Sequence, residues 1–99
     1  MMAYRLTRKA AEDISALFSE GARKFGFGQA EKYHAGLDGI FQLISDNPEL
    51  ARNRLEISPP VRVYPYGSHL IIYLVEGNRD VLIVRVRYGH EDWLASDQS

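Results

Sequence analysis

Two helical patterns separated by a pair of glycines constrain this sequence most. Thr7 is a residue type that caps helices, and Pro48 disfavours helix at the residue before it, so the patterns lie between these two positions. Their apolar positions recur every three or four residues, at Ala10, Ile14, Leu17, Phe18, Gly21 and Phe25 and then at Ala30, Tyr33, Leu37, Ile40, Phe41 and Ile44. Gly26 and Gly28 favour a tight reversal between the two patterns. We therefore expect a helical hairpin whose apolar stripes pack on each other and on a sheet.

Strand patterns flank this hairpin. Residues 1–6 read as one strand, and residues 62–66, 69–75 and 81–88 read as three more, with the middle one apolar on both faces. Pro65 has no backbone N–H to donate to a neighbouring strand, which indicates a bulge or a sheet edge. In the last strand, the face expected to meet the helices consists of Leu82, Val84, Val86 and Tyr88. The predicted fold is α+β, in the order β-α-α-β-β-β, with the hairpin packed on a small antiparallel sheet.

Length and composition limit the function classes. The 99 residues suit one domain, residues 1–99, in which we expect 95–99 to form a disordered tail. The absence of cysteine excludes disulfides and thiolate metal sites, and a reducing cytoplasm fits best. No run of about 20 apolar residues spans a bilayer, and the first residues do not resemble a signal peptide. A net charge of -1 argues against a protein that coats nucleic acid.

Conventional catalytic motifs are weak. His34, His69 and His90 fall in different predicted elements without the close spacing of a metal site, so we expect no metal and no cofactor. Gly26 and Gly28 lack the third glycine and the preceding strand of a phosphate-binding loop. Ser58, Ser68 and Ser96 lie in turn or tail contexts, where turn chemistry explains a serine.

Arginines in the second half give the strongest remaining signal. After Lys32 every basic residue is an arginine, and between positions 52 and 87 six arginines face three acidic residues, a local charge of 6 − 3 = +3. Arginines with a nearby tyrosine and histidine could hold a phosphodiester and move a proton, as in a ribonuclease. The candidate residues for that site are Arg62, Arg85, Arg87, Tyr88 and His90.

Two other interpretations of these arginines stay open. They can pair with Glu56, Glu91 and Asp92, or be solvated on a sheet face. Alternatively, they and nearby aromatic residues form a docking surface for a partner segment.

Nearly the whole chain resembles the ParE toxins of the RelE/ParE superfamily, from bacterial type II toxin–antitoxin modules. The resemblance runs from Tyr4 to about Leu94 and rests on the order of several segments rather than on one motif. These segments are Leu6 to Ile14, Phe25-Gly26-Phe27-Gly28 to Tyr33, Phe41 to Arg52 with Asn47-Pro48, Ser58-Pro59-Pro60 to Tyr73, and Ile83 to Trp93 with Arg85-Val86-Arg87-Tyr88-Gly89-His90.

This resemblance implies a toxin that is not an enzyme. It would inhibit DNA gyrase by stabilising the cleaved enzyme–DNA state, which blocks replication, and it would not bind nucleic acid directly. A ParD-like antitoxin would neutralise it by wrapping it with a C-terminal segment, and a dimeric antitoxin makes a two-plus-two assembly natural. The apolar groove beside the hairpin would receive the antitoxin. The candidate antitoxin- or target-binding residues are Arg52, Arg54, Arg62, Arg85, Arg87, Tyr88, His90 and Trp93.

RelE-type relatives imply a different activity on the same fold, ribosome-dependent cleavage of mRNA. The catalytic residues would then be Arg62, Arg85, Tyr88 and His90. The absence of any lysine after Lys32 favours gyrase. In contrast, the order Tyr88-Gly89-His90 departs from the histidine-then-glycine order of ParE-like sequences and keeps the ribonuclease alternative open.

Overall fold

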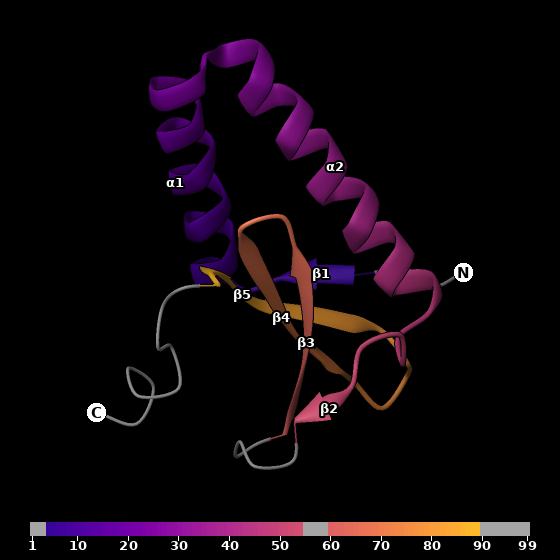
Figure 1. Ribbon diagram of the computed structural model, residues 1–99. Coiled ribbons are helices and arrows are strands. Elements are labelled where there is room, and N and C mark those ends of the chain that lie inside the picture. Colours follow the sequence, from indigo (N-terminus) through magenta and orange to yellow (C-terminus); the bar gives the residue numbers. More distant parts are fainter. Residues whose placement is uncertain (1–3, 55–59, 90–99) are drawn as a thin grey trace.

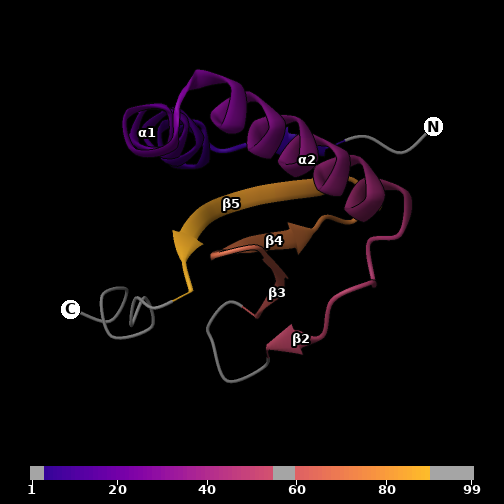
Figure 2. The same cartoon turned by 45° about the horizontal axis from the view of Figure 1, so that its top comes forward.

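Two helices cover one face of a five-stranded sheet in the computed structural model, which describes residues 4–54 and 60–89. The elements are β1 (Tyr4–Leu6), α1 (Arg8–Phe25), α2 (Phe27–Asp46), β2 (Asn53–Arg54), β3 (Val61–Tyr66), β4 (His69–Val75) and β5 (Val81–Tyr88). Figures 1 and 2 show both helices on the same side of the sheet, with the turn that joins them extending beyond it. The predicted α+β fold is confirmed, and the two-residue β2 is an addition to the predicted order.

The sheet is mixed rather than antiparallel, which corrects one detail of the prediction. Its strand order is β1-β5-β4-β3-β2, and β1 pairs with β5 in parallel, from Tyr4↔Val81 to Leu6↔Ile83. The other neighbouring strands are antiparallel. Short turns force antiparallel pairing on β3, β4 and β5, whereas no short turn joins β1 to β5, so their relative direction is not restricted.

The helical hairpin forms for the local reasons that the sequence indicated. The Thr7 Oγ1 atom accepts a hydrogen bond from the Ala10 N–H at 3.0 Å and caps α1. Gly26 alone connects the helices, with a φ of 93° that suits glycine. α2 ends at Asp46, immediately before Asn47 and Pro48, as predicted.

A bulge in β5 changes which side chains face the helices. The pairing with β4 passes from Tyr73↔Ile83 to Ile72↔Arg85, so Val84 is an extra residue in β5. Val81, Ile83 and Val86 therefore belong to the core under the helices. The expectation for Leu82 and Val84 was wrong, because strict alternation fails at the extra residue. Val84 packs instead against Val61 and Ile72, in a smaller apolar cluster on the opposite face of the sheet.

The main core lies between the helices and the sheet. Its buried members include Ile14, Leu37 and Phe41 from the helices and Ile71 and Tyr73 from β4. The buried Tyr73 hydroxyl donates to the Pro48 carbonyl at 2.9 Å and accepts from the Ala51 N–H at 3.2 Å. These bonds fix the connector after α2 to the centre of the sheet.

A smaller cluster on the opposite face contains Val61 and Ile72, so β4 is apolar on both sides, as expected of a central strand. Pro65 lies in β3 beyond the two residues that pair with β2, in regular register with Leu70. This part of β3 is therefore an edge of the sheet, as predicted for Pro65, and the alternative prediction of a bulge there was wrong.

Candidate binding site in the helical hairpin

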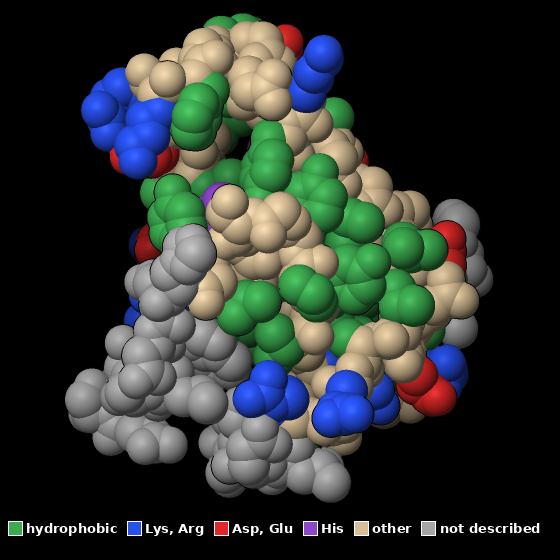
Figure 3. All heavy atoms as spheres, in the orientation of Figure 1, with side chains coloured by type: hydrophobic (Ala, Val, Ile, Leu, Met, Phe, Trp, Pro, Cys, Tyr) green, Lys and Arg blue, Asp and Glu red, His purple; other side chains and the backbone are tan. Residues whose placement is uncertain are grey.

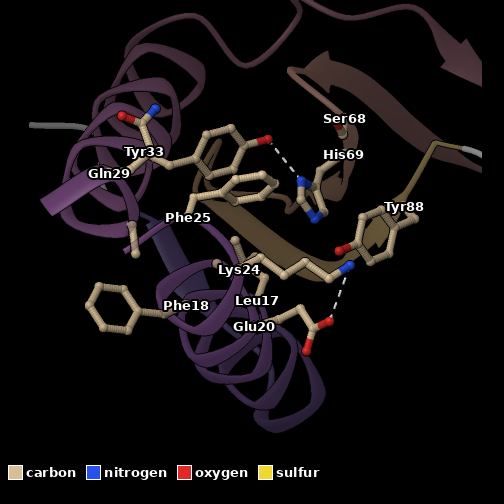
Figure 4. A pocket seen from close by; sticks show the side chains of 12 residues that line it. Leu17, Phe18, Glu20, Lys24, Phe25, Gln29, Tyr33, Ser68, His69 and Tyr88 are labelled. Carbon is tan, nitrogen blue, oxygen red and sulfur yellow. Dashed lines mark hydrogen bonds and ion pairs between the residues drawn. The ribbon is translucent and has the colours of Figure 1, made fainter. Parts of the chain in front are cut away.

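A pocket of about 430 Å³ lies where the hairpin extends past the sheet. We call it the hairpin pocket, and its walls come from α1, α2, the β3–β4 turn and the end of β5 (Figure 4). Its lining residues are Leu17, Phe18, Glu20, Gly21, Lys24, Phe25, Gln29, Ala30, Tyr33, Ser68, His69 and Tyr88. Most of this lining is apolar or aromatic, which suits apolar side chains of a partner.

Three ring side chains converge on this pocket from different elements, as Figure 4 shows for Tyr33, His69 and Tyr88. The Tyr33 hydroxyl lies 2.8 Å from His69 Nδ1 and donates to the Tyr66 carbonyl at 3.0 Å. Because a hydroxyl has only one proton, His69 Nδ1 is then the donor to the Tyr33 oxygen. The His69 and Tyr88 rings stack with centroids 4.5 Å apart. Burial raises the pKa of the Tyr33 hydroxyl above its ordinary value of 10.0.

Close packing at the β3–β4 turn fixes Tyr33. Gly67 has a φ of 56°, and a Cβ atom there would lie 2.5 Å from the Tyr33 hydroxyl oxygen. In the sequence, Tyr33 belongs to the apolar stripe of a helix and His69 stands at the start of an apolar strand. The only signal that could have singled them out is the polar group that each carries within an apolar pattern, the Tyr33 hydroxyl and the His69 imidazole.

Charged side chains lie beside the pocket on α1. The Glu20 carboxylate pairs with Arg23 at 2.7 Å and with Lys24 at 3.3 Å, the second pair being drawn in Figure 4. Hydrogen bonds from Arg23, and then from Lys24, lower the pKa of Glu20. Both cations keep about half or more of their side-chain surface exposed, so they remain accessible to a partner.

Arg85 is held by a carboxylate of α1. Its Nε and Nη2 atoms donate to the Asp13 carboxylate at 2.7 and 3.0 Å, and the Val86 N–H donates to the same carboxylate at 3.0 Å. Arg87 approaches Asp13 more distantly, at 3.9 Å. Asp13 thus joins α1 to β5 beyond the end of β1. The proposed partners Glu56, Glu91 and Asp92 lie outside the described residues.

Arg62 occupies a separate place in the sheet. It lies opposite Tyr73, a residue of the core under the helices, whereas Arg85 lies opposite Ile72 of the other face. Arg62 Nη1 donates to the Ala51 carbonyl at 2.5 Å. The structure therefore does not bring Arg62 and Arg85 to one point.

The remaining predicted site residues divide between two places. Asn53 pairs with Arg62, so Arg52 and Arg54 on either side of it lie at the same end of the sheet. Figure 3 shows cationic side chains there, below a broad hydrophobic surface over α2 and β3. Tyr88 lies at the hairpin pocket, 41% exposed. His90 and Trp93, like the predicted tail 95–99, are outside the described residues.

Metal ligands do not assemble in the part of the chain that the structure covers. Residues 4–54 and 60–89 contain no group of three or more His, Cys, Asp or Glu side chains that could hold an ion. Within the same residues, neither α1 nor α2 has the length and apolar character needed to cross a bilayer.

Comparisons with known proteins agree on one family. A family model described as the ParE toxin of the type II toxin–antitoxin system, parDE, matches residues 4–93. Toxin ParE1 of Caulobacter vibrioides is 30% identical over 86 residues, which cover 87% of this chain and 88% of that relative. Toxin ParE1 of Mycobacterium tuberculosis is 29% identical over 89 residues, covering 90% and 91%.

Solved structures share the fold, and one of them is a toxin–antitoxin system. It is described as the chromosomal ParDE TA system from P. aeruginosa and superposes with a TM-score of 0.74 at 22% identity. The match covers 89% of this chain and 96% of that chain.

Proposed function

The chain belongs to the ParE toxin family of type II toxin–antitoxin systems, and on that premise we propose that its target is DNA gyrase. In this proposal the toxin binds gyrase and stabilises the cleaved enzyme–DNA state, which blocks replication. Such a toxin acts by binding and performs no chemistry of its own. Gyrase works in the cytoplasm, so the toxin acts there too.

The Asp13–Arg85 contact is the observation that most favours gyrase over RNA. A ribonuclease of the RelE type would need its arginines near a proton-transferring group and around one phosphodiester. Here the Arg85 guanidinium makes two hydrogen bonds to a carboxylate that is only 14% exposed, while Arg62 starts from the other face of the sheet. Arg85 therefore has a structural task, and its separation from Arg62 argues against a shared phosphate site.

The hairpin pocket supports the second part of the proposal, neutralisation by a ParD-like antitoxin. Its aromatic and aliphatic lining would accept apolar side chains from the antitoxin's C-terminal segment. Arg23 and Lys24 on α1, and the arginines at the β2 end of the sheet, would pair with acidic side chains of that segment. A dimeric antitoxin would hold two toxins in a two-plus-two complex.

A cleavage assay with purified gyrase tests the proposal. Toxin added to gyrase and supercoiled plasmid should cause linear, cleaved plasmid to accumulate, and toxin mixed beforehand with its antitoxin should not. Unchanged supercoiling and no cleaved plasmid at a large excess of toxin would exclude gyrase as the target. Cleavage of mRNA on translating ribosomes by the same preparation would instead support the ribonuclease alternative.

A further inference from the structure

The tip of the helical hairpin exposes two phenylalanine rings. Phe25 is 71% exposed and Phe27 is 61% exposed, the largest values among the large hydrophobic residues that the structure describes. They flank Gly26 at the point farthest along the hairpin from the sheet, as Figure 1 shows. Exposed apolar rings of this size are costly in water and often mark a binding surface.

The tip is held rigidly rather than loosely. The Gly26 N–H donates to the Ala22 carbonyl at 3.0 Å, and the Gly26 carbonyl accepts from the Ala30 N–H at 3.1 Å. The Phe27 ring packs edge-on against Phe18, with centroids 5.7 Å apart. Little conformational freedom is left for the tip to lose on binding, which favours affinity.

Cations lie close to the two rings along the chain. Residues 20–32 contain Arg23, Lys24 and Lys32 against Glu20, which pairs with the first two, and Glu31, so their net charge is 3 − 2 = +1. The Arg23 side chain is 69% exposed and the Lys24 side chain 51%. The complementary surface is therefore an apolar cleft with carboxylates at its rim.

We propose that this tip, residues 23–28, is the part of the toxin that inserts into the target protein. The surface of the target that receives it is an apolar cleft with carboxylates at its rim. The inference rests on the proposed function, in which the target is gyrase. Phe25 also lines the hairpin pocket, whereas Phe27 does not. An antitoxin seated in the pocket would cover the Phe25 ring, so binding of antitoxin and of target would exclude each other at this residue.

Phe27→Ser tests the inference because it removes a ring that is not itself part of the pocket lining, although it packs against Phe18 of that lining. Loss of one interface hot spot weakens binding about 30-fold, so the toxin concentration for half-maximal gyrase inhibition should rise by about that factor. Antitoxin affinity, measured by calorimetry, should change less than about twofold and reports that the variant is folded. Phe27→Leu, which keeps apolar surface, should retain most of the inhibition.

Two further variants complete the test. Phe25→Ser should weaken both gyrase inhibition and antitoxin binding, and it replaces Phe27→Ser if that variant does not fold. Leu50→Ser is the matched control, since Leu50 is 46% exposed in the connector after α2, and it should change neither.

The outcomes separate the two proposals. If the wild-type toxin does not inhibit gyrase, the proposed function fails. If it inhibits gyrase and Phe27→Ser and Phe25→Ser inhibit equally well, the function stands and the tip is not the contact. Loss of DNA binding, vesicle binding or self-association in Phe27→Ser, with gyrase binding unchanged, would also overturn the inference.

Discussion

Removal of the Asp13 carboxylate should destabilise the toxin severely for its size. In the native structure this carboxylate accepts three hydrogen bonds, two from Arg85 and one from the Val86 N–H. The side chains of Asp13 and Arg85 are only 14% and 24% exposed, so solvent cannot fully replace the lost partner. Breaking a buried pair on one side costs about 3 to 5 kcal/mol, and the partial exposure here places Asp13→Ala near 3 kcal/mol.

The effect is measurable by thermal and urea unfolding. A loss of about 3 kcal/mol lowers the melting temperature of a domain of this size by roughly 12 to 24 °C. Glu12→Ala is the matched control on the same helix. Glu12 is 68% exposed and lies 3.7 Å from Arg8, so its removal should cost less than about 0.5 kcal/mol.

A double-mutant cycle then isolates the pair. Asp13→Ala with Arg85→Ala should lose less stability than the sum of the two single variants, because the second substitution removes a charge already left without its partner. The reasoning is refuted if Asp13→Ala unfolds within about 1 kcal/mol of the wild type, as the Glu12 control does. Arg85 would then have no structural task, and a catalytic task would again be open to it.

Three other predictions concern buried or constrained groups. Tyr73→Phe should lower the free energy of unfolding by about 1 to 3 kcal/mol in urea titrations, because two buried backbone groups lose their partner. Gly67→Ala should destabilise by more than about 1 kcal/mol, since its Cβ would meet the Tyr33 hydroxyl, whereas Gly39→Ala, an open position in α2, should stabilise by up to about 1 kcal/mol. Burial, with a hydrogen bond to a carboxylate of α2, raises the pKa of Tyr4 from 10.0 to about 12. The stability that the protonated Tyr4 hydroxyl contributes is present below pH 10 and is lost as the pH rises through 12. Tyr4→Phe should therefore flatten the alkaline part of a plot of the free energy of unfolding against pH.

The helices could be predicted from the sequence because their determinants are local. Thr7 caps α1 through the N–H three residues later, and Gly26 reverses the chain by its own φ angle. In contrast, which side chains of β5 face the helices depends on an extra residue, Val84, and an alternating pattern does not reveal such a residue. The parallel pairing of β1 with β5 likewise joins residues from the two ends of the described chain.

The candidate site was harder to predict for the same reason. Asp13 and Arg85 are 72 positions apart, and Tyr33 and His69 are 36 apart, so no spacing rule connects them. The sequence did single out the arginines and Tyr88. It could not tell that Arg85 is held by α1, because that depends on where the first helix lies over the last strand.

The choice of target is tested most directly in cells that express the toxin without its antitoxin, by measuring DNA breaks and mRNA integrity in the same culture. A toxin that targets gyrase should produce double-strand breaks covalently linked to gyrase, with mRNA intact on the ribosomes, during the first phase of growth arrest. Cleaved mRNA at the ribosome together with intact DNA would contradict gyrase as the target.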